Sequence, residues 1–256
     1  MLPKWWPSPD SCIFEDCLDI MPQLPDGKID MILCDLPYGV TQNVKDKQIS
    51  FDKLWENYKR IIKPNGAIVL TAQQPFVTDL INSCRDWFKY DIIWDKIIIT
   101  GFLNANKMPL RSHEHVLVFY DKQPTYNPQK TIGKATHGGS AKTNVNRNYG
   151  DFTRPKESNT SNVKFPVSII KYSKPHPSIA RHPTEKSLKL FEYLIRTYTE
   201  PGEIVFDNCV GCGTTLEASM NTNRIGLGCE WDNQYKDTIR KRCMFDNSKL
   251  EQFGGE

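Results

Sequence analysis

Two periods of hydrophobic and polar positions alternate along the chain. Short apolar runs, typical of buried parallel strands, are separated by segments whose apolar residues recur at helical spacing. The pattern predicts strands at residues 11–14, 29–34, 67–71, 90–94, 115–120, 204–206 and 225–229. It predicts helices at residues 16–24, 51–62, 76–88, 183–198 and 214–220. Strands that alternate with helices indicate an α/β fold on a mostly parallel sheet.

The periodicity is lost between residues 121 and 181. This segment is rich in Asn, Lys, Thr, Gly and Pro, and its aromatic residues are isolated. A stretch of this length without regular structure inside a compact domain is usually functional or disordered. The sequence therefore predicts one half of a domain at residues 1–120, a recognition insert at 121–178 and the other half of the domain at 179–256.

The charge is distributed unevenly along the chain. The net charge is +3, but residues 122–189 carry ten Lys and three Arg against three acidic residues, a net +10. The remainder of the chain is therefore at about −7. A basic block beside a mildly acidic body is typical of a nucleic-acid-binding groove. A solvated, lysine-rich loop is the alternative that charge alone leaves open.

Composition narrows the class of protein further. The contents of apolar residues (39%) and charged residues (25%) are those of an ordinary globular protein. No apolar run reaches the length of a membrane span, and the N-terminal residues 1–9 lack the apolar core of a signal peptide. Eight cysteines are scattered without a secretory signal, which predicts a reducing cytoplasm. Cys209 and Cys212 have zinc-ligand spacing but no second pair to complete a site, so no metal is predicted.

One candidate site lies at residues 206–215, where a strand meets a glycine-containing turn and a helix. Gly211 and Gly213 allow a ligand to approach the backbone, and Glu230, at the end of the next strand, is suited to accept hydrogen bonds from ribose hydroxyls. Asp207 suits a cationic amino group, and a nucleotide-like ligand with an amino-acid end is S-adenosylmethionine. Leu216 at the third glycine position disfavours a dinucleotide. A tight turn without a ligand stays the alternative.

A second candidate site is Asp35-Leu36-Pro37-Tyr38, directly after a predicted buried strand. An exocyclic amino nitrogen is a poor nucleophile because its lone pair is delocalised into the base. A carboxylate and a backbone carbonyl that accept its two N–H groups favour tetrahedral geometry and aim the lone pair at a methyl donor. Pro37 fixes the turn, and Tyr38 offers a ring on which a flipped base can stack. A plain turn in which Asp35 serves as a cap is the alternative.

Together the two motifs resemble those of the amino-methyltransferase family of DNA methyltransferases, D-P-P-Y and D-P-F-x-G-x-G-T-T. Asp35, Pro37 and Tyr38 match the first motif, while the segment from His182 to Lys186 looks like the family's H-P-T-x-K motif. The resemblance implies a catalytic loop of Asp35, Leu36, Pro37 and Tyr38. It implies cofactor contacts from His182, Thr184, Asp207, Asn208, Gly211, Gly213, Thr214, Thr215 and Glu230. The order of catalytic loop, basic block and cofactor loop is that of the family's β class.

The resemblance further implies a seven-stranded, Rossmann-like sheet, S-adenosylmethionine as cofactor and transfer of its methyl group to adenine in double-stranded DNA. The insert would bind phosphates through Lys130, Lys134, Lys142 and Arg147. A cytosine-N4 enzyme, an inactive DNA-binding relative and a small-molecule or RNA methyltransferase stay open. A homodimer and a cognate restriction endonuclease are further expected partners, in a bacterial or phage-infected cell.

Three positions depart from the family pattern. Leu36 replaces the first proline of the catalytic loop, but it keeps the backbone carbonyl that the chemistry needs. Asn208 and Cys209 replace Pro-Phe, so an aromatic contact near the cofactor is expected to be missing.

Trp94 and Lys96 are expected to border the pocket of the target base.

Overall fold

The computed structural model describes residues 11–39, 48–134, 162–175 and 185–243. The chain forms two compact units. The larger comprises residues 1–127 and 168–256, and the smaller is Pro128–Val167. Within the described ranges, every helix is too short or too polar to cross a membrane.

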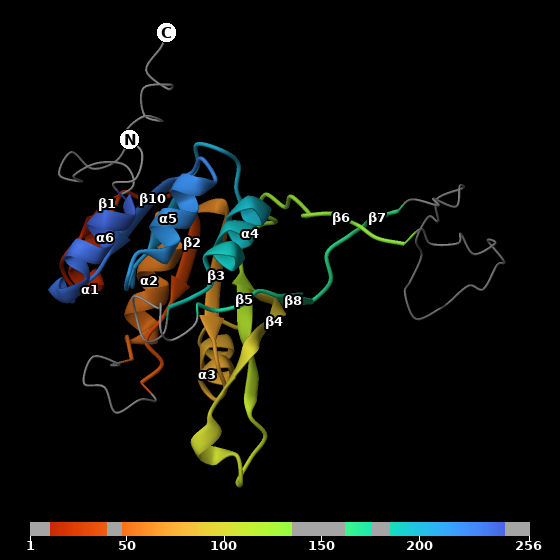
Figure 1. The fold of residues 1–256 in the computed structure, drawn as a ribbon. Helices are drawn as coiled ribbons and strands as arrows, with labels where there is room; N and C mark the ends of the chain where they lie inside the picture. Colours follow the sequence, from red (N-terminus) through yellow and green to blue (C-terminus); the bar gives the residue numbers. More distant parts are fainter. Residues whose placement is uncertain (1–10, 40–47, 135–161, 176–184, 244–256) are drawn as a thin grey trace. The chain divides into compact units, whose positions relative to one another are not determined.

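A mixed sheet of eight strands forms the centre of the larger unit (Figure 1). Its strands, in spatial order, are β1 (Ser11–Ile13), β10 (Ile225–Cys229), β9 (Ile204–Asp207), β2 (Ile29–Asp35), β3 (Ile62–Ala72), β5 (Arg111–Phe119), β4 (Phe88–Thr100) and β8 (Ile169–Lys171). All neighbours are parallel except at β5, which runs antiparallel to both β3 and β4.

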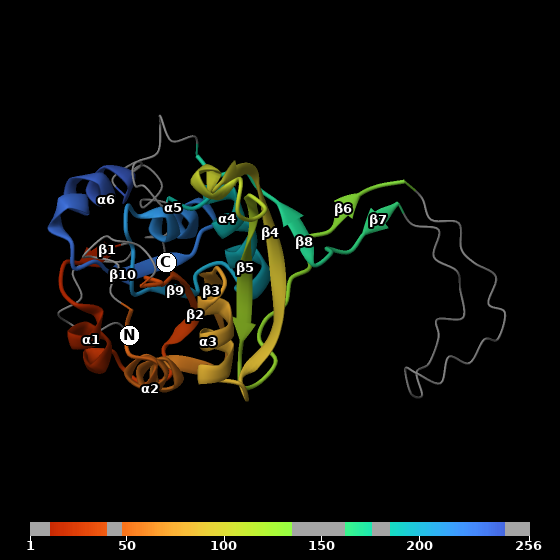
Figure 2. The same cartoon turned by 90° about the horizontal axis from the view of Figure 1, so that it is seen from below.

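Helices cover both faces of this sheet (Figure 2). They are α1 (Cys17–Ile20), α2 (Phe51–Ile61), α3 (Phe76–Ser83), α4 (Leu188–Tyr198), α5 (Thr214–Asn221) and α6 (Lys236–Cys243). Short 3-10 turns lie at η1 (Met21–Gln23), η2 (Phe102–Asn104) and η4 (Asn233–Tyr235). Strand β2 shows why two layers are needed, because Ile32 and Cys34 pack with α2 and α3 while Met31 and Leu33 pack with α4.

The α/β class and the mostly parallel sheet predicted from sequence are confirmed. The described part of the chain adds an eighth strand, because β8 pairs with β4 from within the aperiodic segment. This strand has three residues, of which only Ile170 is buried, so it carries no readable period. Helix α6 was not predicted from the hydrophobic pattern, because six of its eight residues are polar or charged.

The smaller unit contains the described strands β6 (Thr131–Ile132) and β7 (Val163–Lys164), which pair antiparallel. The ammonium of Lys130 lies 4.7 Å from the centre of the Phe165 ring in the same unit. The boundaries predicted for the insert, 121–178, stay a prediction; the compact unit itself spans 128–167, and residues 168–171 lead into and form β8 of the larger sheet.

Gly228 provides a sharp test of how the sheet supports the loop after β9. A Cβ at this position would lie 2.1 Å from Cγ2 of Val210 and 2.7 Å from the carbonyl oxygen of Asp207. We expect Gly228→Ala to lower the free energy of unfolding by about 1–3 kcal/mol, the usual cost of overpacking. Urea denaturation measures it. Gly226→Ala, whose Cβ would lie no closer than 3.1 Å to its neighbours, is the control and should lose less. Equal losses of unfolding free energy in the two variants would contradict the close packing of Gly228 against Val210 and Asp207.

Candidate active site

Three carboxylates lie along one edge of the sheet. Asp35 ends β2, Asp207 ends β9, and Glu230 follows β10 directly. Because β10, β9 and β2 are adjacent and parallel, their carboxyl ends meet at the same edge. The fold therefore brings together the two motifs, which lie about 170 residues apart in the sequence.

Asp35 is held through one of its two carboxylate oxygens. Oδ1 accepts hydrogen bonds from the hydroxyls of Tyr38 (2.8 Å) and Thr71 (2.5 Å), and it lies 3.1 Å from Nζ of Lys186. Among the described residues, no donor contacts Oδ2. The side chain is 21% exposed, and its Oδ1 takes every hydrogen bond and ion pair that the described residues make with the carboxylate.

The ring of Tyr38 is packed in place. Its centre lies 5.1 Å from that of Phe76, and Nζ of Lys186 lies 5.6 Å from the Tyr38 ring centre. Burial, followed by the neighbouring charge of Asp35, holds the pKa of Tyr38 well above its ordinary value. The hydroxyl therefore stays protonated and keeps donating to Asp35. Leu36, which replaces the family's proline, is almost fully buried.

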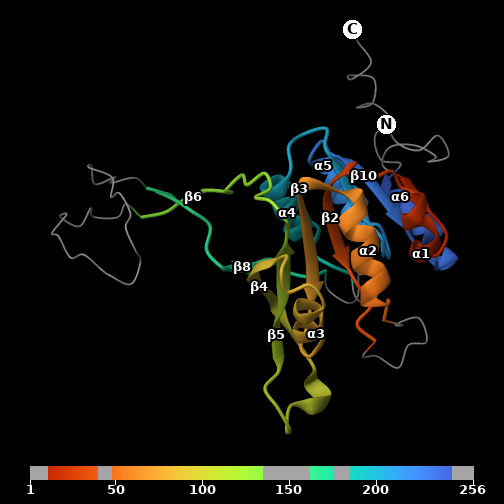
Figure 3. The same ribbon diagram turned by 180° about the vertical axis from the view of Figure 1, so that it is seen from behind.

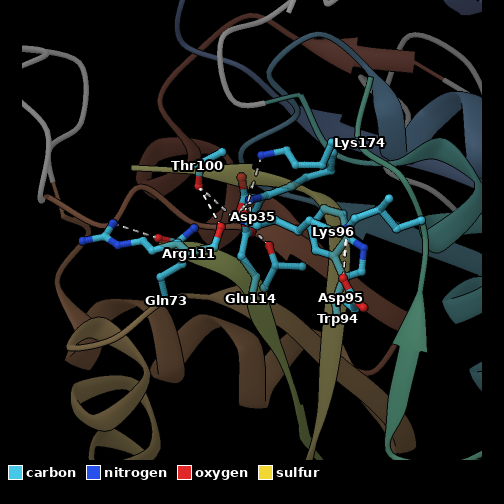
Figure 4. A network of polar contacts seen from close by, with 12 residues as sticks. Asp35, Gln73, Trp94, Asp95, Lys96, Thr100, Arg111, Glu114 and Lys174 are labelled. Atoms are coloured by element: carbon cyan, nitrogen blue, oxygen red, sulfur yellow. Dashed lines mark hydrogen bonds and ion pairs between the residues drawn. The ribbon is translucent and has the colours of Figure 1, made fainter. Parts of the chain in front are cut away.

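A buried cluster of charges stands behind Asp35 (Figure 4). At its centre Glu114 of β5 is 1% exposed, with Nζ of Lys186 2.6 Å from its Oε2. Nζ of Lys96 lies 3.3 Å and Nζ of Lys174 3.6 Å from its Oε1. Three ammonium groups thus surround one carboxylate, and Lys186 connects that carboxylate to Asp35.

The charges in this cluster shift one another's pKa values. Burial alone would raise the pKa of Glu114, but Lys186, Lys174 and Lys96 outweigh it and lower that pKa to about 2. Burial would lower the pKa of Lys186, but Asp35, Tyr38 and Glu114 raise it well above its ordinary value. Burial and the neighbouring Lys186 lower the pKa of Lys174. Glu114 is therefore a carboxylate at neutral pH, and Lys186 an ammonium ion.

The sequence singled out two residues of this region, and the expected role of Trp94 and Lys96 at the pocket of the target base stays a prediction. Lys96, expected to border the pocket, is fully buried against Glu114, and Trp94 lies 5.9 Å from the ammonium of Lys186. Lys186 had a signal as the last residue of the motif that resembles H-P-T-x-K. Glu114 and Lys174 had none, because nothing local distinguishes them from surface charges.

The cofactor loop begins at Asp207, which is 2% exposed. Its Oδ1 accepts from the backbone N–H of Cys209 (2.9 Å), and its Oδ2 accepts from the hydroxyl of Thr215. Burial raises the pKa of Asp207 to about 6, against the opposing effect of these hydrogen bonds. Gly213, with φ +93°, starts α5 in a conformation that disfavours other residues, and Thr214 is buried beside it.

Glu230 closes the other side of the loop. Its Oε2 accepts from the backbone N–H of Gly211 (2.7 Å), and its Oε1 accepts from that of Asp232 (2.8 Å). Burial raises the pKa of Glu230, and the two N–H donors oppose that rise. Gly211 has φ +57° and an open space where a Cβ would be. The carboxylate is thus oriented by the backbone while it retains lone pairs for a ligand.

Tertiary contacts surround Asn208, the first of the two departures in the cofactor loop. Oδ1 of Asn208 accepts a hydrogen bond of 2.5 Å from the hydroxyl of the buried Tyr58. Nδ2 of Asn208 points at the sulfurs of Cys17 (3.6 Å) and Cys209 (3.5 Å). A tyrosine from α2 and two thiols therefore surround the Asn208 side chain. All eight cysteines are free thiols.

Arg242 of α6 ties the cofactor loop to the segment that resembles H-P-T-x-K. Its Nη1 donates to the carbonyl of Cys212 (2.9 Å), and its Nη2 donates to Oε1 of Glu185 (2.7 Å). Its Nε donates to Oε2 of Glu217 (2.6 Å) on α5. The guanidinium is buried and supports the loop from behind.

Some predicted site residues lie outside the described residues, namely His182, Thr184, Lys142 and Arg147. Lys130 and Lys134 lie in the described part of the smaller unit, and their role in binding DNA stays a prediction. In the described part of the chain, no group of three or more His, Cys, Asp or Glu side chains is arranged to hold a metal ion.

Comparison with known proteins gives the family. A family model described as DNA methylase (N6/N4 methyltransferase) matches residues 29–241. The Type II methyltransferase M.BglII of Bacillus subtilis is 25% identical over 249 residues, which cover 87% of this chain and 65% of M.BglII. The DNA adenine methyltransferase YhdJ of Escherichia coli K12 is 24% identical over 242 residues, covering 87% of this chain and 79% of YhdJ. The chain thus spans slightly less than two thirds of M.BglII.

Solved structures share the fold over nearly the whole chain. The M1.HpyAVI–SAM complex matches with a TM-score of 0.62 and 24% identity, covering 91% of this chain and 99% of that one. The PvuII DNA methyltransferase, which is cytosine-N4-specific, matches with a TM-score of 0.67 and 17% identity, covering 95% and 89%. Since the family model matches well over half of the chain, this protein belongs to the N6/N4 DNA methylase family.

Proposed function

We propose that this protein transfers a methyl group from S-adenosylmethionine to the exocyclic amino group of adenine in double-stranded DNA. The observation that carries the proposal is the placement of Asp35 on the same sheet edge as the cofactor loop, with every contact from the described residues to its carboxylate made at Oδ1. A cytosine-N4 reaction uses the same geometry and is the second candidate, because a cytosine-N4-specific enzyme shares the fold.

The cofactor loop fits S-adenosylmethionine. The open space at Gly211 admits a ligand against the backbone, and Glu230 is oriented to accept from ribose hydroxyls. Asp207 is buried and has a raised pKa, so a cationic amino group beside it would stabilise its charged form. When bound, S-adenosylmethionine supplies a methyl group made electrophilic by its sulfonium. Asn208, Gly213, Thr214 and Thr215 shape the loop, and His182 and Thr184 are proposed to complete it.

Asp35 performs the central step on the target base. Oδ2 accepts one N–H of the amino group, and the carbonyl of Leu36 accepts the other, which Pro37 helps to present. The amino nitrogen then forms its bond to the methyl carbon as the carbon–sulfur bond breaks, and a proton leaves to solvent. The ring of Tyr38 provides the surface against which the flipped base stacks.

The buried charges keep Asp35 suited to this task. The ammonium of Lys186 lies on the Oδ1 side, where it balances the carboxylate without competing for Oδ2. Glu114 in turn holds Lys186 in place at 2.6 Å. Glu114 is therefore a positioning residue, which acts on the base only through Lys186 and Asp35.

Adenine is the preferred base because Asp stands at the head of the catalytic tetrapeptide, where cytosine enzymes of the family more often carry Ser. Lys130 and Lys134, with Lys142 and Arg147, are proposed to bind DNA phosphates. A homodimer and a cognate restriction endonuclease are proposed partners. None of these assignments changes the chemistry at Asp35.

Asp35→Ala should lower the rate of methyl transfer by orders of magnitude, because the amino group loses its acceptor. Binding of cofactor and DNA should stay within about tenfold, or 1.4 kcal/mol, of wild type. The measurements are transfer of labelled methyl to plasmid DNA, and calorimetry for the cofactor. Mass spectrometry of digested DNA should show methylated adenine; N4-methylcytosine would refute the base assignment and keep the mechanism. Full activity in Asp35→Ala would falsify the mechanism.

Two variants of Tyr38 separate its ring from its hydroxyl. Tyr38→Ala should weaken capture of the flipped base by roughly 1–3 kcal/mol, because it removes the stacking surface. Tyr38→Phe keeps that surface and removes the hydroxyl, which donates to Oδ1 of Asp35 (2.8 Å) and accepts from Nζ of Lys186 (3.4 Å), so it should bind DNA as wild type does and lose turnover alone. Steady-state kinetics on the same plasmid distinguish the two. Identical behaviour of both variants would contradict the stacking role.

Cofactor affinity should depend on pH through Asp207. Its pKa of about 6 in the free protein lies above the ordinary value for Asp, so the carboxyl is protonated below pH 6 and must lose its proton to face a cationic amino group. Affinity should therefore be level above about pH 7 and fall by up to about tenfold per pH unit below pH 6. Calorimetry between pH 5 and 8 measures it. Asp207→Asn should bind weakly and flatten the profile; an unchanged slope in that variant would assign the dependence to another group, Glu230 first.

Glu114→Gln should destabilise the fold because three buried ammonium groups lose their shared anion. Removing one partner from a buried charge cluster usually costs about 3–5 kcal/mol of unfolding free energy. The matched control is Asp86→Asn, which breaks the exposed ion pair with Lys59 and should cost less than about 1 kcal/mol. Urea denaturation compares the two. A loss in Glu114→Gln no larger than in the control would show that the cluster is not a stabilising unit.

A further inference from the structure

Strands β4 and β5 continue beyond the end of the sheet as a two-stranded arm, residues 97–112. The register pairs Ala72, the last residue of β3, with His115 of β5, so residues 111–114 pass beyond β3. Strand β4 accompanies them through the pair Thr100–Arg111. Because Asp35 pairs with Thr71, the arm leaves from the edge that carries the catalytic carboxylate. Figures 1 and 3 show it projecting from the body of the protein.

The arm carries exposed apolar side chains. Phe102 is 78% and Leu103 83% exposed, and both lie in the turn at the tip. The other large apolar residues exposed on it are Ile97, Ile99, Met108 and Leu110. Exposed apolar side chains that gather on one element are typical of a surface that contacts a partner.

The charge of the arm indicates the kind of partner that it could contact. Residues 97–112 contain Lys107 and Arg111 and no acidic residue, in a region where the remaining chain outside 122–189 is acidic on balance. Both basic side chains are exposed. Cationic residues interleaved with apolar ones suit a polyanion with stacked bases.

The base of the arm joins the active site. Oγ1 of Thr100 donates to the carbonyl of Arg111 (3.3 Å), and Nζ of Lys96 donates to Oγ1 of Thr100 (3.3 Å) (Figure 4). Lys96 in turn contacts Glu114, and Glu114 contacts Lys186, the lysine beside Asp35. The arm therefore starts from the buried network of Glu114, which also contacts Lys186 beside Asp35.

An irregularity in β4 marks the point where the strand passes from the buried sheet into the exposed arm. The register shifts between Asp95 and Thr100, and Ile97 has φ +65°, a conformation that β-branched residues rarely adopt. Oδ1 of Asp95 accepts the backbone N–H of Ile97 (2.9 Å) and stabilises this bend. As a result Lys96 points into the charge cluster while Ile97 and Ile99 are exposed. Bulges of this kind re-aim side chains beside functional sites.

We propose that the arm is a DNA-opening wedge, in which Phe102 and Leu103 enter the duplex beside the target base while Lys107 and Arg111 contact its phosphates. The inference rests on the proposed function, because it requires DNA at the catalytic edge. Unstacking a base step is costly, and apolar side chains that fill the vacated space offset that cost. The wedge thus assists delivery of the base to Asp35 without touching the reacting atoms.

The test uses the full-length protein and duplexes that contain the site located by sequencing modified plasmid DNA. Phe102→Ala/Leu103→Ala should lower the methylation rate on a matched duplex about tenfold or more, since opening then lacks its apolar filler. On a duplex with a mismatch at the target base the variant should recover to within about threefold of wild type, because a mismatched base is easier to extrude. Phe102→Trp/Leu103→Met keeps the apolar volume and should retain most activity on both duplexes.

Other outcomes have distinct meanings. If wild-type protein methylates no DNA, the proposed function fails, and the wedge with it. If wild type is active and the double alanine variant is equally slow on matched and mismatched duplexes, or unaffected on both, the wedge is overturned and the proposed function stands. If wild type sediments as a dimer and the double alanine variant as a monomer, the arm is a contact between copies, which also overturns the proposal. Cofactor affinity by calorimetry should be unchanged in both variants.

Discussion

The burial of one carboxylate among three ammonium groups is the interaction on which the proposed catalytic edge depends. Glu114 lies in the interior of the larger unit, where an unpaired charge would be prohibitive. Lys96, Lys174 and Lys186 neutralise it, and they reach it from β4, from the segment after β8 and from the segment before α4. A single buried charge thus joins parts of the chain that share no local structure, and it determines where Lys186 can point.

The consequence for chemistry is an asymmetric carboxylate. Oδ1 of Asp35 takes hydroxyl and ammonium partners from Tyr38, Thr71 and Lys186, so the side chain can rotate little. An acceptor whose orientation is fixed before the substrate arrives costs no reorganisation in the transition state, which is the basis of electrostatic catalysis. The proposed reaction needs this property, because the protein supplies no covalent intermediate and must work by positioning.

The cofactor edge relies on backbone geometry where the catalytic edge relies on charge. Gly228 lets Val210 and the carbonyl of Asp207 pack against β10, and Arg242 supports the loop from α6. Two backbone N–H groups orient Glu230, and the open space at Gly211 gives a ligand access to the same loop. The proposed catalytic and cofactor-binding groups are thereby set along neighbouring parallel strands, a placement that the order of strands dictates.

The sequence by itself determined most of the strands and helices, the α/β class and the two motifs. Hydrophobic period, glycine spacing and turn residues are local properties, and they sufficed for β2, β9, α2 and α4. The tertiary structure decided which oxygen of Asp35 is pinned, that Glu114 is buried, and that Tyr58 and neighbouring thiols contact Asn208. It also revealed β8 and the projecting arm. These features depend on partners far apart in the chain, whose pairing leaves no periodic signal in the sequence.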